Sequence, residues 1–89
     1  MRSHTTAAFR EAFSELPKSV QEQARRAYRQ FQRDPWHPGL RFKQVHPRLP
    51  IYSVRLSKGY RAVGQRSEEH IVWFWVGSHA DYDSLLSQL

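Results

Sequence analysis

Apolar residues recur at helical spacing over the first third of the chain. In the first segment, which Pro17 ends, these residues are Ala8, Phe9, Ala12, Phe13 and Leu16, preceded by the N-cap candidates Thr5 and Thr6. A second segment begins with Ser19 and Glu22 in the spacing of a capping box, and its apolar face holds Val20, Ala24, Ala27, Tyr28 and Phe31. Together they predict a helical hairpin that packs its apolar side on a sheet and turns arginines outward.

The middle of the chain predicts a loop followed by a β-hairpin. Prolines at positions 35, 38, 47 and 50 make residues 34–50 mainly a loop, in which residues 40–45 can form a short strand near an edge. Residues 51–56 and 60–66 then alternate between apolar and polar and are separated by Ser57-Lys58-Gly59. That spacing predicts a hairpin whose turn is closed by Gly59 in a left-handed conformation.

The register of this hairpin decides where its arginines lie. If Leu56 faces Tyr60, Arg55 and Arg61 lie directly opposite each other on one face of the sheet. Like charges in that position destabilise a strand pair by about a few tenths of a kcal/mol, which indicates an anion normally bound between them. Three alternatives stay open: a neighbouring carboxylate fills that role, the two side chains splay into solvent, or a two-residue turn puts them on opposite faces.

The last third predicts a core strand and a helix. The run IVWFWV, from Ile71 to Val76, is continuous in β-branched and aromatic residues, as expected for a strand covered on both faces. Gly77 ends it, and Ser78 with Asp81 has the spacing of a helix N-cap. The apolar positions of this helix are Tyr82, Leu85, Leu86 and Leu89.

The order α-α-β-β-β-α predicts one α+β domain over residues 1–89. It consists of a small antiparallel-rich sheet packed against an N-terminal helical hairpin, with a short C-terminal helix. A further strand at residues 2–6 is too short to assign from pattern alone.

Charge is distributed unevenly along the chain. All 14 Lys and Arg lie at or before Arg66, whereas the segment from residue 67 onward carries acids and no Lys or Arg. A basic surface on one side favours a polyanion or an acidic protein as partner. The absence of cysteine excludes disulfides and thiolate metal sites, the histidines lack ligand spacing, and we expect neither a metal nor another cofactor. No segment is apolar enough for export or membrane insertion, which predicts a cytoplasmic protein without membrane contact.

Four stretches of sequence resemble the RelE/ParE superfamily of bacterial toxins from type II toxin–antitoxin modules. They are ELPKSVQEQARRA, FQRDP, YSVRLSKGYRAV and IVWFWVGSHADYDSLL. The resemblance implies a short N-terminal strand before the helical hairpin. It also implies a cognate antitoxin that wraps and neutralises the toxin, and contact with operator DNA only through that antitoxin.

The superfamily divides by activity. RelE-like members cut mRNA in the ribosomal A site without metal, and ParE-like members bind DNA gyrase. For the first activity, the resemblance places Arg61 and Arg55 on the scissile phosphate, with His79 as general acid or base and Tyr82 as a further catalytic candidate. Packing in the core is the alternative for Tyr82.

Two positions depart from the RelE pattern: Ser53 stands where a lysine is usual, and Leu85 stands at the equivalent of the catalytic tyrosine. These departures favour the second activity, gyrase inhibition without nuclease chemistry. A third reading is a degenerate toxin that only binds its antitoxin.

We expect the ribosome and mRNA as partners of the first activity, and six basic residues as RNA-binding candidates. These are Lys43, Arg41, Lys58, Arg25, Arg29 and Arg33. The alternative for each is a solvated surface side chain.

Overall fold

The computed structural model describes all 89 residues, and it confirms the predicted α+β class. In chain order the elements are β1 (Arg2–Thr5), α1 (Ala7–Ser14), α2 (Lys18–Arg33), a 3₁₀ turn η1 (Pro38–Leu40), β2 (Lys43–Gln44), β3 (Ile51–Ser57), β4 (Tyr60–Ser67), β5 (His70–Ser78) and α3 (His79–Gln88). None of the helices has the length and the apolar character needed to cross a membrane.

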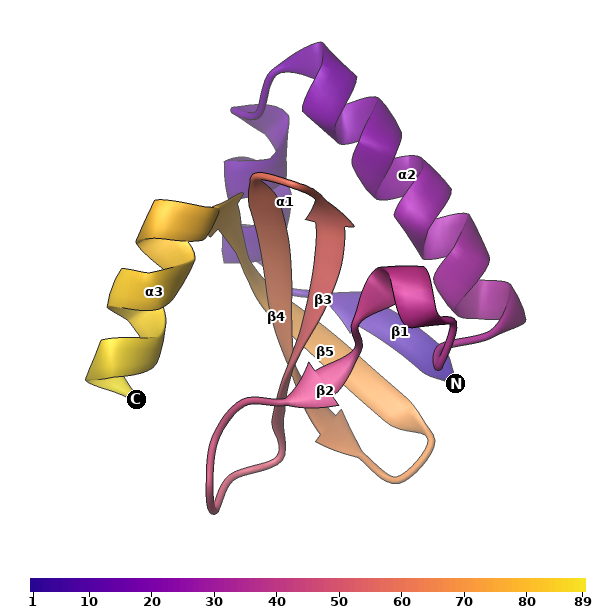
Figure 1. Ribbon diagram of the computed structural model, residues 1–89, viewed down its shortest axis with the longest axis vertical. Helices are drawn as coiled ribbons and strands as arrows, with labels where there is room; N and C mark the ends of the chain where they lie inside the picture. Colours follow the sequence, from indigo (N-terminus) through magenta and orange to yellow (C-terminus); the bar gives the residue numbers. More distant parts are fainter.

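The strands form one sheet in the order β1-β5-β4-β3-β2 (Figure 1). Strands β3, β4 and β5 are an antiparallel meander, and β1 pairs in parallel with β5. Strand β1 is the N-terminal strand that the family resemblance implies. Strand β2 lies at the other edge, inside the segment expected to form an edge strand, but it is only two residues long because prolines follow it.

The helices cover the two faces of the sheet unequally. Helices α1 and α2 lie on one face, where α1 contacts β5 and α2 contacts β3, and α3 lies on the other (Figure 1). The larger core cluster, under α1 and α2, consists of Phe31, Leu40, Phe42, Val54, Ala62, Ile71, Trp73 and Val76. The smaller cluster, under α3, consists of Ile51, Val63 and Tyr82. Two thin cores therefore share one sheet, as expected for a domain of this size.

Two of the three predicted helix caps are confirmed. The Thr6 hydroxyl accepts the N–H of Phe9 at 3.0 Å and begins α1. The Ser78 hydroxyl accepts the N–H of Asp81 at 3.2 Å and begins α3. Each hydroxyl satisfies one of the free backbone donors of the first turn.

The predicted capping box of Ser19 and Glu22 is wrong. Helix α2 begins at Lys18, and Pro17 occupies the N-cap without a side-chain hydrogen bond. Proline already has a backbone φ of −54°, close to that of a helix, so it starts the helix one residue before Ser19 can cap it. The turn between the helices is held by Gln21, whose side-chain amide donates to backbone carbonyls at the end of α1.

The apolar strand β5 contains a β-bulge. Val63 pairs with Trp75 and Gly64 pairs with Trp73, so Phe74 is an extra residue on β5. The prediction that this strand is covered on both faces is correct only for its second half, which α3 covers. Val72 lies in the first half, on the face away from α1, and is 39% exposed.

Candidate functional site

The hairpin of β3 and β4 places Arg55 directly opposite Arg61, as predicted. The predicted turn is wrong in its details, because Ser57 rather than Leu56 pairs with Tyr60 and Gly59 does not adopt a positive φ. A register shift between Arg55 and Ser57 absorbs one extra residue, so a tight turn and facing arginines coexist.

Arg61 is half-buried at the base of the turn. Its Nη1 donates to the backbone carbonyls of Ser57 at 2.7 Å and Tyr60 at 3.0 Å. Burial lowers the pKa of Arg61 most, and the charge of Arg55 lowers it further. Tyr82 opposes this shift, Arg41 adds a weaker lowering, and Asp83 a weaker opposing effect. The positive charge of the arginines in this site is therefore only partly compensated by neighbouring groups.

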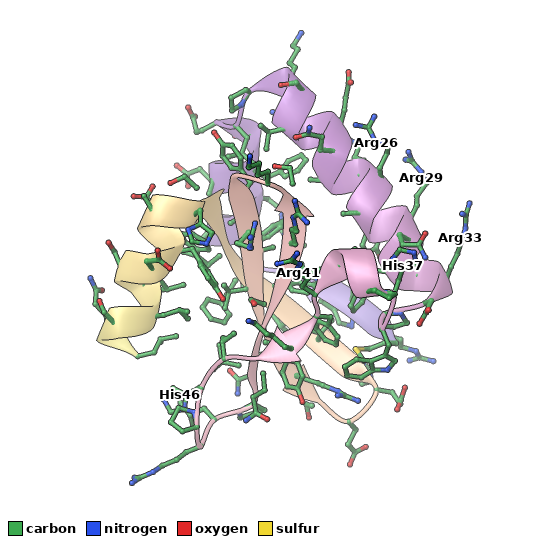
Figure 2. The ribbon with its side chains drawn as sticks, in the orientation of Figure 1. Arg26, Arg29, Arg33, His37, Arg41 and His46 are labelled. Carbon is green, nitrogen blue, oxygen red and sulfur yellow. The ribbon has the colours of Figure 1, made fainter.

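Arg41 is brought to this site by the backbone at the end of η1. It adopts a left-handed conformation with φ of 47°, which is uncommon for a residue other than glycine. Figure 2 shows its side chain over the strands, whereas Arg26, Arg29 and Arg33 point from α2 away from the sheet. Arg41 and Arg55, from different elements of the fold, thus both act on Arg61.

His79 lies in the first turn of α3, the helix whose residues Tyr82 and Asp83 act on the pKa of Arg61. Its backbone N–H donates to the Gly59 carbonyl at 2.8 Å, which ties the start of α3 to the hairpin turn. Its imidazole Nδ1 lies 3.4 Å from the carboxylate of Asp83, one helical turn later, and the side chain is 50% exposed. An oriented and accessible imidazole is suited to proton transfer.

Asp83 is the member of this site that sequence reasoning missed. The signal was present, because His79 and Asp83 are four residues apart on a predicted helix and therefore face the same side.

Tyr82 packs in the core under α3 and borders the site, since its ring lies 5.8 Å from that of His79 and it acts on the pKa of Arg61. It is 7% exposed, packs in the cluster under α3, and donates its hydroxyl to the Ser53 hydroxyl at 3.0 Å. Ser53 is itself only 2% exposed. The packing alternative for Tyr82 is therefore the one that the geometry supports.

The remaining RNA-binding candidates are dispersed. Lys58 is exposed in the hairpin turn, Lys43 is exposed on the short edge strand, and the three others, Arg25, Arg29 and Arg33, are exposed on α2. The structure does not gather the candidates of α2 around Arg61. No group of His, Cys, Asp and Glu side chains is arranged to hold a metal ion.

An apolar groove of about 920 Å³ separates α1 from α2. Its walls and floor include Phe9, Phe13, Tyr28, Val54, Leu56 and Trp73. Its rim carries Arg10, Arg25 and Arg29, and the Ser3 hydroxyl that borders it is buried without a hydrogen-bond partner. The sequence predicts that the hairpin packs its apolar stripe on the sheet. The structure shows that the stripe is covered only in part, since the two helices diverge.

Solved structures with the same fold are toxins of low sequence identity. The RelB–RelE antitoxin–toxin complex from Methanococcus jannaschii matches with a TM-score of 0.74 and 12% identity, over 92% of this chain and 96% of that chain. YafQ from E. coli matches with a TM-score of 0.72 and 7% identity, over 92% and 98%. The isolated E. coli RelE toxin matches with a TM-score of 0.65 and 19% identity, over 99% and 98%. At these identities the likeness shows the fold.

The family follows from a separate comparison. No curated protein matches the chain. Residues 18–84, which include both strands of the arginine hairpin and most of α3, match the model of the ParE-like toxin domain. This match covers most of the chain and confirms the resemblance found in the sequence. The chain belongs to the ParE-like toxin domain family.

Proposed function

We propose that this protein is the toxin of a toxin–antitoxin module and cuts mRNA on the ribosome. The observation that carries the proposal is the cluster of Arg41, Arg55 and Arg61, in which no arginine forms an ion pair. Burial and mutual repulsion disfavour these like charges, and a bound anion stabilises them. The phosphate of RNA is such an anion, and arginine binds phosphate in bidentate geometry. A toxin that acts on ribosomes is located in the cytoplasm.

Arg61 is suited to hold the scissile phosphate. In metal-free cleavage the ribose 2′-oxygen attacks phosphorus, the bond from phosphorus to the 5′ oxygen breaks, and negative charge grows on the phosphate oxygens. Only Nη1 of Arg61 bonds to the protein, so the N–H groups on Nε and Nη2 remain for those oxygens. Arg55, directly opposite, supplies the second positive charge.

His79 is suited to move the proton. Cleavage needs a group that removes the proton of the 2′-OH and a group that gives one to the leaving 5′ oxygen. Histidine exchanges a proton near neutral pH, and the Asp83 carboxylate lies 3.4 Å from Nδ1, which leaves Nε2 without a protein partner. Tyr82 takes no part in this mechanism, because its hydroxyl bonds to Ser53 in the core.

The test is primer extension on a reporter mRNA incubated with translating ribosomes and purified protein. Arg61→Ala should reduce A-site cleavage about 100- to 1,000-fold, the range for loss of one group that stabilises developing charge. Arg48→Ala removes the same charge from an exposed loop, and Tyr82→Phe removes only the buried hydroxyl, so both should cut like wild type. Cleavage by Arg61→Ala at the wild-type rate would refute the mechanism.

A second candidate function, inhibition of DNA gyrase by binding, is favoured by one observation. Ser53, where the RelE pattern has lysine, is buried against Tyr82, so this position offers no catalytic side chain. A toxic protein that produces no cuts but inhibits supercoiling by purified gyrase would establish this function. A chain without either activity that still binds an antitoxin would be a degenerate toxin.

The antitoxin is proposed to occupy the apolar groove between α1 and α2. Several solved relatives are complexes of a RelE toxin with a RelB antitoxin. In this chain the groove offers apolar walls, basic residues at its rim and the unpartnered Ser3 hydroxyl. A segment with apolar side chains flanked by acids complements all three features. Contact with operator DNA then occurs through the antitoxin.

A further inference from the structure

A second cleft, of about 410 Å³, lies between α2, η1 and the turn of the β3–β4 hairpin. It is separate from the apolar groove, although Ala27 and Leu56 border both. Its polar lining consists of Arg26, Arg55, Lys58, His37, Gln23, Gln30 and Ser57, and no Asp or Glu contributes to it. Every charged group in the cleft is therefore positive.

The cations of this cleft come from separate elements and have no acidic partner. Arg26 belongs to α2, Arg55 to β3 and Lys58 to the hairpin turn, and none of them forms an ion pair. Figure 2 shows Arg26 pointing away from the sheet, so its guanidinium stands at the outer rim. A cleft bordered by three positive side chains from separate elements, without a carboxylate, is complementary to a bound anion.

His37 adds a donor whose direction is set by the backbone. Its Nδ1 accepts the N–H of Gly39 at 3.1 Å, as the N-cap of η1. Because a backbone N–H only donates, Nδ1 carries the lone pair, and the ring proton of the neutral imidazole is on Nε2. Gly39 allows this arrangement, since a Cβ at that position would lie 3.2 Å from the ring. Nε2–H is therefore free to donate to a ligand.

We propose that this cleft binds a second backbone phosphate of the RNA strand, next to the phosphate held at Arg61. Arg55 belongs to both places, because it lines the cleft and faces Arg61 across the hairpin. The proposal rests on the proposed function for the nature of the ligand. It adds that the RNA strand continues from the reacting phosphate over the hairpin turn toward α2. There the side-chain amides of Gln23 and Gln30, which line the cleft, contact the RNA.

The experiment measures binding of a trinucleotide of 2′-O-methyl RNA, which cannot be cleaved, by fluorescence anisotropy over a range of NaCl concentrations. The variant Arg26→Gln/Lys58→Gln removes two cleft charges, and Lys18→Gln/Arg48→Gln removes the same charge from exposed positions outside both clefts. For single strands, the slope of log affinity against log salt is about −0.7 for each phosphate neutralised. The cleft variant should lose about 0.7 from the magnitude of this slope and bind about tenfold more weakly at low salt.

The control pair should keep the wild-type slope. Equal slopes and affinities for the two double variants would overturn the proposal. Cleavage of reporter mRNA by the same proteins separates this proposal from the proposed function. A wild-type protein that cuts, together with a cleft variant that binds the trinucleotide normally, refutes only the cleft. A protein that never cuts but shows the slope change refutes only the endonuclease and retains the phosphate site.

Discussion

At the scale of single residues, the central feature of this protein is an arginine pair that is unfavourable to the free chain. Arg55 and Arg61 face each other, Arg41 adds a third charge, and the pKa of Arg61 is lowered by burial and by these neighbours. A lowered pKa of a base means that folding disfavours its charged form. Arginine keeps its proton at all ordinary pH values, so this cost is present throughout and is relieved by salt or an anion rather than by pH.

Arg55→Gln should therefore stabilise the free protein. Removing one charge of the facing pair should raise the free energy of unfolding by about 0.2–0.5 kcal/mol at low salt, because Arg55 has no ion pair or side-chain hydrogen bond to lose. The same substitution should raise the pKa of Arg61. Urea unfolding at low and high NaCl concentration measures the effect, which should shrink as salt screens the repulsion. Arg48→Gln, in an exposed loop, is the control, and a loss of stability in Arg55→Gln at low salt would contradict the repulsion.

At the scale of elements, two β-bulges decide which side chains meet. The shift between Arg55 and Ser57 keeps the arginines opposite each other above a tight turn, and the extra residue Phe74 divides the apolar side chains of β5 between the two cores. The second bulge depends on Gly64. A Cβ there would lie 2.9 Å from side-chain atoms of Ile71 and Trp73 and 3.0 Å from the Val72 carbonyl.

Gly64→Ala should destabilise the protein by about 1–3 kcal/mol, the range for overpacking of a closely packed interior. Backbone and core side chains surround the new methyl group, and neither can move without disturbing β5. The matched control is Gly59→Ala, since a Cβ at that exposed turn position meets nothing within 4 Å and the backbone has no positive φ. Thermal or urea unfolding compares the two variants. Equal stability of both would show that β5 adapts to the methyl group.

At the scale of the whole molecule, none of the 14 Lys and Arg is neutralised by an acidic side chain. The single contact within 4.0 Å between a basic and an acidic side chain joins His79 to Asp83, and the formal net charge with neutral histidines is +6. The largest concave surface is apolar and lies between diverging helices. Unpaired positive charge and an open apolar groove are features that partners of complementary chemistry cover, which fits the proposed RNA strand on one surface and the proposed antitoxin segment on another.

Tyr28→Glu should weaken binding of the antitoxin and so reduce neutralisation of the toxin. Tyr28 lines the groove and is 43% exposed, so the glutamate is tolerated in the free chain but places an unpaired carboxylate in an apolar interface. Affinity for the cognate antitoxin should fall at least about tenfold, a loss of about 1.4 kcal/mol, as measured by titration calorimetry.

Leu49→Glu is the matched control, because Leu49 is 50% exposed and lies outside the groove. Both variants should keep the mRNA cleavage of wild type. An antitoxin that binds Tyr28→Glu and Leu49→Glu with equal affinity would exclude the groove as its site.

Local patterns determined the elements of this fold. The helical spacing of apolar residues, the Thr6 and Ser78 caps, the alternation in β3 and β4 and the apolar run of β5 each depend on residues close together in the chain. The facing arginines were predicted from the sequence as well, since pairing within one hairpin involves only residues near its turn.

Tertiary structure alone decided three features of the protein. Arg41 joins Arg55 and Arg61 because η1 ends in a left-handed residue above the strands, which no periodicity predicts. The Tyr82 hydroxyl is engaged in a hydrogen bond to Ser53, 29 residues earlier in the chain. The apolar groove exists because α1 and α2 diverge over the sheet, and the basic cleft forms where α2, η1 and the turn of the β3–β4 hairpin meet. The angle between packed elements depends on side chains from every layer at once. Short-range sequence patterns determine the helices and strands, whereas contacts between these elements determine the candidate sites.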